Sequence, residues 1–409
     1  MENQINNFII LLTNFLHRDS QLVLEEPVEW DKIMSHARKH NMQGIVFEMA
    51  VQYMDFKKLK KYDSYFWETA RIIAGQVFRT REFLELYSKF AENNIFPIVL
   101  KGIVCRKLYG EFRDRRPSGD EDILICKEEF EKTKQILEAN NYKMAECELT
   151  KEKINTIQEV SFYNKQTGSH IEVHLNVMGT NNLLNKKMSN CFRNVFDTYI
   201  LMEEQGVEFR TLNHTDHVLY LIMHAFKHFI YTGFGIRQVI DILLYIEKYG
   251  DCCDWDYIKK TVTEIHAEYF VSDLIHIGNK YLGFSLKMWK EEKCTEALFE
   301  DIISNGIFGE KSPAKSMSAL VISSAVDDFE KKKKSSTFKW ILRSIFPGKE
   351  WLAVNVPEAR KKPWGILGAY FKRWKKAFTF FYGERVSLVG ESMRISGKRV
   401  ALIRKYEII

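Results

Sequence analysis

The chain has 409 residues, enough for two or three domains, and a hydrophobic fraction of 45% that is sufficient for substantial buried cores. This composition excludes wholesale disorder, and 7 Pro with 21 Gly exclude a collagen-like or linker-dominated chain. The net charge of +6 conceals a division: residues 331–409 carry 20 Lys and Arg against 5 Asp and Glu, whereas residues 1–330 have a net charge of −9. We expect the basic segment to contact an anionic partner.

Residues 1–90 are predicted to form a helical N-terminal region. Apolar side chains recur at helical spacing from Ile5 to Leu16 and again from Trp30 to Ala37. A third, longer helix is predicted from about Tyr62 to Asn93, because this stretch keeps an apolar face and contains one Gly and no Pro.

Residues 91–180 have a different sequence pattern, in which short apolar runs alternate with helical stretches. The predicted strands are residues 96–100, 123–126, 160–163 and 170–175. The predicted helices are residues 103–109 and 128–140, and a charged loop follows the first of them. This order predicts a small mixed sheet covered by helices on one side, and hence an α+β fold with helical flanks.

The helical period returns from Asn181 to about Phe346, which predicts a second helical domain over residues 181–330. The lysine run at 331–334 predicts an exposed linker to a basic, aromatic segment, residues 331–409. Residues 364–382 fit three structures: a helix packed on the core, a platform for RNA or another polyanion, or a helix on an anionic membrane surface.

The most informative motif is Gly119-Asp120-Glu121-Asp122, which leads into an apolar strand. Side chains two residues apart on a strand share a face, so Asp120 and Asp122 point the same way and Glu121 points to the other face. Two such carboxylates are stabilised by divalent cations, and hard oxygen ligands favour Mg²⁺ or Mn²⁺. Glu172, in a downstream strand, is the best candidate for a third carboxylate in a two-metal site. The alternative is an ordinary surface strand with an acidic pair.

Lys101-Gly102 lies directly after a predicted strand and before a predicted helix. There, backbone N–H groups and the positive helix end favour phosphate oxygens, with the lysine as a point charge. The alternative is a plain strand-to-helix turn. Arg113, Arg115 and Arg116 in the following loop add cations beside the predicted metals, or belong to a solvated charged loop.

Three histidines, His217, His224 and His228, share one helical face. They fit a zinc site, the lining of a cleft, or satisfied interior side chains, and no H-E-x-x-H glutamate lies between the last two. Arg237 and Asp241 are four residues apart, which favours a structural ion pair over contacts with an acceptor substrate.

The segments Val99-Leu100-Lys101-Gly102 and 116–122 resemble the Leu-Lys-Gly and Arg-x-x-Gly-Asp-x-Asp signatures of an uncharacterised bacterial nucleotidyltransferase family. That family belongs to the DNA polymerase β-like superfamily and is related to kanamycin nucleotidyltransferases and abortive-infection toxin transferases. Similarity extends over about residues 28–260. It includes Glu29-Trp30-Asp31-Lys32, the strand with Glu172 and His174, and the helical stretch from His224 to Asp241.

The resemblance implies an enzyme that moves a nucleoside monophosphate from an NTP to an acceptor and releases pyrophosphate, with Mg²⁺ or Mn²⁺ as cofactor. Asp120, Asp122 and Glu172 would be the catalytic residues and metal ligands. The nucleotide would be contacted by Lys101, Gly102, Arg116 and Gly119. Two departures stand out: Gly102 is followed by Ile103 where the superfamily has Gly or Ser, and the third carboxylate is Glu where Asp is commoner.

The acceptor could be a sugar phosphate, a small metabolite, a peptide or protein, or a tRNA. The helical domain over residues 181–330 would lie on the side of the site where the acceptor binds. The alternative function is a catalytically silent scaffold that binds nucleic acid or an anionic membrane through residues 331–409.

The cysteine and apolar patterns bear on the compartment. Seven cysteines without a C-x-x-C pair argue against a disulfide framework or a zinc ribbon. The apolar stretch from Phe8 to Leu12 is too short for a signal peptide. No run approaches the roughly 20 apolar residues of a membrane span. We therefore expect a cytoplasmic protein with reduced thiols.

Overall fold

The computed structural model describes residues 2–18, 22–145, 157–180, 182–289, 291–306, 313–333 and 387–408, and the single positions 149, 154, 155, 339, 340 and 368. The predictions for residues 364–382 concern a segment that, apart from Gly368, lies outside the described residues. The same is true of Cys147.

The N-terminal region is helical, as predicted. Its helices are α1 (Asn3–Leu16), α2 (Trp30–Lys39), α3 (Gln43–Ala50), α4 (Met54–Lys57) and the long α5 (Tyr62–Glu92). The apolar faces of α1 and α2 pack into a core that continues to the rest of the chain, with Phe8, Leu12 and Trp30 all buried in it. A hydrophobic face at helical spacing thus predicted these elements well.

A seven-stranded mixed sheet follows α5, in the order β3-β4-β5-β2-β1-β7-β6. Its strands are β1 (Ile98–Val99), β2 (Glu121–Leu124), β3 (Tyr142–Met144), β4 (Glu159–Asn164), β5 (His170–His174), β6 (Ile200–Glu204) and β7 (Val207–Thr211). At its centre β2 pairs in parallel with β5 and antiparallel with β1, while β1 pairs in parallel with β7. The predicted α+β class is confirmed.

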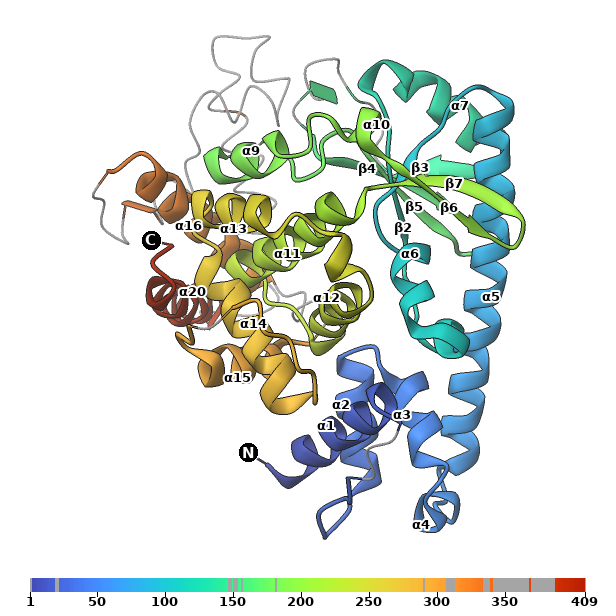
Figure 1. Cartoon of the computed structure of the whole chain (residues 1–409), viewed down its shortest axis with the longest axis vertical. Coiled ribbons are helices and arrows are strands. Elements are labelled where there is room, and N and C mark those ends of the chain that lie inside the picture. Colours follow the sequence, from blue (N-terminus) through green and yellow to red (C-terminus); the bar gives the residue numbers. More distant parts are fainter. Residues whose placement is uncertain are drawn as a thin grey trace.

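Short helices connect the strands and α5 supports one face of the sheet. The connections are α6 (Ile103–Arg106), the 3-10 helices η1 (Lys107–Arg115) and η2 (Lys127–Glu129), α7 (Phe130–Ala139), α9 (Leu183–Asn190) and α10 (Val195–Thr198). Helix α5 runs along the sheet and reaches down to the N-terminal helices (Figure 1). The Tyr87 hydroxyl of α5 donates to the Pro97 carbonyl at 2.9 Å, which fixes the start of β1.

The C-terminal part is again helical. Its elements are α11 (His214–Tyr231), α12 (Ile236–Tyr249), η3 (Gly250–Cys252), α13 (Trp255–Glu264), α14 (Glu268–Tyr281), α15 (Thr295–Asn305), α16 (Pro313–Glu330) and α20 (Ser387–Lys405). The end of the chain returns to this part (Figure 1), where Ile403, Tyr406 and Ile408 are buried in the main core. The Tyr406 hydroxyl donates to Asp273 at 2.6 Å.

Two sequence predictions of secondary structure were wrong. The stretch after residue 180 was expected to be helical, but it contains the β6–β7 hairpin, which extends the sheet past β1. The helix expected over 103–109 ends at Arg106 and continues as the 3-10 helix η1, in which Gly110 has φ 57° and breaks the helical path.

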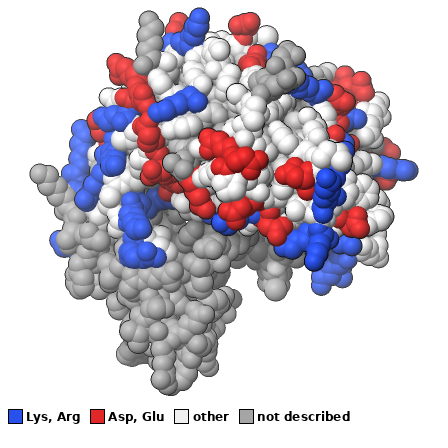
Figure 2. Space-filling model, turned by 90° about the horizontal axis from the view of Figure 1, so that it is seen from below, with Lys and Arg blue, Asp and Glu red and all other residues white. Residues whose placement is uncertain are grey.

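None of the described helices combines the length and apolarity needed to cross a bilayer. On the described part of the face in Figure 2, acidic and basic side chains are interspersed.

Candidate functional site

Three carboxylates meet on the face of the sheet opposite α5. Asp122 in β2 is the direct neighbour of Glu172 in the parallel strand β5, and Asp120 lies two residues before Asp122. One ligand atom from each of Asp120, His170 and Glu172 lies within 4.8 Å of the others, and the same holds for Asp122, Glu172 and His174. The structure therefore brings together the three acids singled out in the sequence.

Glu121 points to the other face, as the alternation of the strand predicts. Its carboxylate accepts hydrogen bonds from the Arg106 guanidinium at 2.5 Å and from the Ile103 backbone N–H at 2.8 Å. The side chain thus closes the N-terminus of α6 from within the protein.

This contact changes the interpretation of Gly102. The residue has φ 63°, and a Cβ built on it would lie 1.9 Å from the Glu121 Oε2 atom. Glycine is needed here because the backbone is left-handed and because Glu121 occupies the space of a side chain. Phosphate was expected at this turn, but the first amide of α6, that of Ile103, is already paired with Glu121. Contact between Gly102 and a nucleotide therefore stays a prediction, and the Ile103 amide is not available for it because it donates to Glu121.

Two histidines of β5 join the carboxylates, and neither was predicted from the sequence to belong to the site. His174 donates from Nε2 to Asp122 Oδ1 at 3.1 Å, and its Nε2 lies 3.7 Å from Glu159. His170 stacks on Tyr163 of β4 with ring centroids 4.1 Å apart, and its Nε2 lies 3.9 Å from Glu172 Oε1. The alternation His170-Ile171-Glu172-Val173-His174 was the signal, since it places both imidazoles on the face of Glu172.

Close packing of like charges perturbs the acids strongly. Burial, with added repulsion from Asp122, Glu159 and Asp120, raises the pKa of Glu172 to about 10. Burial and Asp122 raise the pKa of Asp120 to about 6. Burial also opposes ionisation of Asp122, but the hydrogen bond and charge of His174, together with the Lys101 charge and a hydrogen bond with Glu172, outweigh burial and lower the Asp122 pKa. At neutral pH the cluster therefore carries ionised Asp120 and Asp122 beside a protonated Glu172, and a bound cation would favour ionisation of all three.

Lys101 extends from the end of β1 toward the same face. Its Nζ donates to His224 Nδ1 of α11 at 3.4 Å, and its charge lowers the pKa of both Asp120 and Asp122 as a secondary effect. Lys101 thus stands between the acidic face of the sheet and α11.

The loop before Asp120 is clamped by buried side chains. The Arg116 guanidinium, 1% exposed, donates two hydrogen bonds to Asp241 of α12 at 2.9 and 2.5 Å and one to Ser118 Oγ at 2.8 Å. Arg237 of α12 donates to the Pro117 carbonyl. The Ser118 amide donates to Gln76 of α5 at 2.8 Å. Helices on both sides of the sheet therefore fix the segment that presents Asp120.

The contacts of this loop test the sequence predictions for Arg116, for the Arg237–Asp241 pair and for Gly119. Arg116 was expected at phosphate oxygens, but its donors are engaged by Asp241 and Ser118, and phosphate contact stays a prediction. The ion pair expected between Arg237 and Asp241 is wrong in its partner, because Asp241 pairs with Arg116. A Cβ on Gly119 would meet no atom within 4 Å, so no steric need for glycine is evident there.

The other loop arginines do not join the carboxylates. Arg113 pairs with Glu204 at 2.6 Å and Arg115 pairs with Glu48 at 2.8 Å. The expectation that they add positive charge beside the metals was wrong, because other acids neutralise them.

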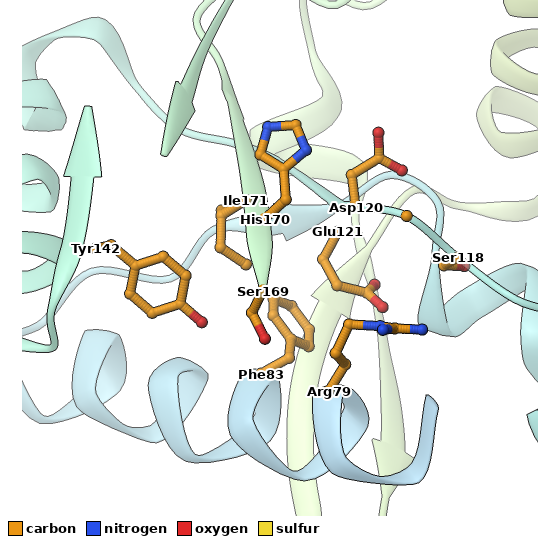
Figure 3. A pocket seen from close by; sticks show the side chains of 10 residues that line it. Arg79, Phe83, Ser118, Asp120, Glu121, Tyr142, Ser169, His170 and Ile171 are labelled. Atoms are coloured by element: carbon orange, nitrogen blue, oxygen red, sulfur yellow. The ribbon is translucent and has the colours of Figure 1, made fainter. Parts of the chain in front are cut away.

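A cavity of about 10 Å³ lies between the sheet and α5, too small for more than about one water. Figure 3 shows Glu121 and Arg79 pointing into this side, while Asp120 and His170 project from the other face. The cavity is therefore behind the site, and it is no place for a nucleotide.

The α11 histidines form no metal group within the described residues. His217 is fully buried against Tyr245, with ring centroids 4.6 Å apart, as an interior side chain. His224 and His228 lie next to each other, 4.7 Å between centroids, and His224 meets Lys101.

The comparisons with known proteins agree with this geometry. A family model described as an uncharacterised nucleotidyltransferase matches residues 26–283, a range that contains all seven strands and every carboxylate of the cluster. No curated protein and no solved structure matches the chain significantly.

Proposed function

The chain belongs to this family of uncharacterised nucleotidyltransferases, and on that premise we propose that it transfers a nucleoside monophosphate from an NTP to an acceptor hydroxyl or phosphate, releasing pyrophosphate. The observation that carries the proposal is the convergence of Asp120, Asp122 and Glu172 on one face of β2 and β5. Three acids packed this closely, with Asp122 buried and Asp120 and Glu172 partly buried, are costly without a cationic partner, which favours a cation-dependent reaction.

The donor set fits a divalent cation. Carboxylate oxygens of Asp120, Asp122 and Glu172 suit Mg²⁺ or Mn²⁺, and the imidazoles of His170 and His174 are better suited to Mn²⁺ than to Mg²⁺. Asp120, Asp122, Glu172 and His170 would hold the cation, while His174, whose Nε2 donates to Asp122, would orient that ligand. Bound there, it would supply charge neutralisation at the phosphates and make an acceptor oxygen easier to deprotonate.

The side chains of the protein would position the reactants. The acceptor oxygen forms a bond to the α-phosphorus as the bond to the bridging oxygen breaks, and that electron pair leaves with pyrophosphate. Glu172 would take the acceptor proton. His174 orients Asp122 through its hydrogen bond, and the clamp of Arg116, Asp241 and Arg237 holds the loop of Asp120. Positioning and electrostatics supply most of the rate enhancement in such transfers.

The test is label transfer in a cell extract. Full-length protein is incubated with extract and each NTP, labelled in one arm at the α-phosphate and in another at the γ-phosphate. We expect α-label on an acceptor with the wild type, and none with the double variant D120N/D122N. The matched control is D251N/D256N, two exposed aspartates of η3 and α13. Transfer of γ-label would indicate a phosphotransferase instead. Equal Mg²⁺-dependent NTP binding by the wild type and D120N/D122N, without any transfer, would favour the scaffold function.

A further inference from the structure

Helix α11 presents a polar row toward the acidic face of the sheet. Tyr220, His224, Lys227 and His228 recur at helical spacing on the side of α11 that contains the contact with Lys101. Lys227 donates to Gln158, which lies directly before β4, and the negative charges of Glu159 and Glu172 act on its ammonium group. The row therefore lies opposite the carboxylates.

The two lysines of this region differ from four of its arginines, although Arg237 also donates to a neutral group, the Pro117 carbonyl. Arg106, Arg113, Arg115 and Arg116 are each paired with a carboxylate. The hydrogen bonds found for Lys101 and Lys227 among the described residues are to neutral groups, His224 and Gln158. Two partly buried ammonium groups without an acidic hydrogen-bond partner indicate a place for an anion.

Tyr220 supplies an independent observation. Its side chain is 0% exposed and its hydroxyl has no hydrogen-bond partner within the described structure. After burial, the charges of Asp122 and Glu159 contribute most to raising the Tyr220 pKa, so the hydroxyl lies within electrostatic reach of the carboxylates. A buried hydroxyl without a partner is costly, and a ligand oxygen would satisfy it.

We propose that Lys101, Lys227 and Tyr220 bind the β- and γ-phosphates of the NTP, and afterwards the pyrophosphate product, between α11 and the carboxylates. This inference rests on the proposed function and assigns the polyphosphate to α11 in place of the N-terminus of α6, whose first amide is paired with Glu121. As the bond from the α-phosphorus to the bridging oxygen breaks, the ammonium groups donate hydrogen bonds to the pyrophosphate oxygens that receive the negative charge.

The test measures binding of inorganic pyrophosphate to the full-length protein by calorimetry in Mg²⁺. Because a hydrogen bond to a charged group is worth about 1.5–3 kcal/mol, we expect K227M to weaken binding by about 10- to 100-fold. The conservative variant K227R should recover part of the affinity. The control K260M, at an exposed position of α13, should bind as the wild type.

Y220F separates a ligand contact from a structural role. Since the hydroxyl has no partner to lose, we expect unchanged or increased thermal stability together with weaker pyrophosphate binding. Unchanged pyrophosphate affinity in both K227M and Y220F overturns the inference. If label transfer still depends on Asp120 and Asp122 in that case, only the assignment to α11 fails. If it does not, the proposed function fails as well.

Discussion

Asp122 and Glu172 are direct partners across the parallel strands β2 and β5, and they share a candidate cation group with His174. Parallel pairing fixes their backbones side by side, so the two acids cannot separate without breaking the sheet. The arrangement holds charge repulsion in place until a cation or a proton relieves it.

Removal of Asp122 should uncouple the protein from divalent cations. For the wild type, Mn²⁺ at 100 times its Kd is expected to raise the free energy of unfolding by about 2.7 kcal/mol. In D122N most of that gain should disappear, because the variant lacks a central ligand. Urea unfolding with and without Mn²⁺ measures the difference, with D256N on α13 as control. Full Mn²⁺ stabilisation in D122N would show that the cation binds elsewhere.

The raised Glu172 pKa predicts a pH dependence of the metal-free protein. The folded state holds the Glu172 proton up to a pKa of about 10, whereas the unfolded chain releases it near the usual 4.5. The stabilisation from that proton is therefore complete below pH 4.5 and is lost as the pH rises toward 10. We expect unfolding by urea in EDTA to become easier from pH 6 to pH 9, by at most about 1.4 kcal/mol per pH unit.

The variant E172Q tests the origin of that slope. Since glutamine does not titrate, E172Q should flatten the dependence and be more stable than the wild type at pH 9. The control E203Q replaces an exposed glutamate of β6. A slope that is identical in E172Q would assign the titration to another group.

Gly102 should tolerate no side chain. G102A puts a Cβ 1.9 Å from a Glu121 oxygen at a left-handed φ of 63°, so Glu121 must leave both Arg106 and the α6 amide. We expect a loss of about 3–5 kcal/mol of stability, as for breaking a buried pair. G110A is the matched control: φ is 57° but a Cβ meets no atom within 4 Å, so only about 1 kcal/mol of backbone strain is expected. Equal losses in both variants would contradict the steric argument.

The Arg116–Asp241 pair should matter for folding before it matters for substrate. Because both side chains are buried, D241N leaves a guanidinium without its counter-charge, and we expect a loss of about 3–5 kcal/mol in urea unfolding. Breaking the exposed Arg81–Glu85 pair with E85Q should cost under about 0.5 kcal/mol. If D241N were as stable as the wild type but bound nucleotide more weakly, the result would indicate that Arg116 contacts the nucleotide.

The local part of the site could be predicted from the sequence. Strand alternation alone places Asp120 and Asp122 on one face and Glu121 on the other, and an apolar run marks β2. Glu172 could be chosen because its strand is short and similarly patterned. The same alternation places His170 and His174 on the face of Glu172, but imidazoles do not belong to the acidic pattern that identifies the three carboxylates.

Long-range pairing could not be predicted in the same way. Asp241 lies 125 residues from Arg116, and nothing in its spacing distinguishes that partner from the nearer Arg237. The β6–β7 hairpin is half-exposed and surrounded by helical patterns, which hid it. Its two-residue turn, Gln205 with φ 52° and Gly206 with φ 80°, has the left-handed geometry of a tight hairpin. The glycine at the second turn position was the signal available in the sequence.

Neighbouring residues of β2 have different roles on opposite faces of the sheet, which makes this strand intolerant of insertions and deletions. Glu121 secures the interior through Arg106 and α6, while its neighbour Asp122 serves the opposite face. A shift of β2 by one residue would exchange the two faces. Asp122 would then point toward Arg106 behind the sheet, and Glu121 would point to the face of the candidate site. Insertion or deletion of a single residue in β2 would therefore disrupt both the buried contact of Glu121 with Arg106 and the carboxylate cluster on the opposite face.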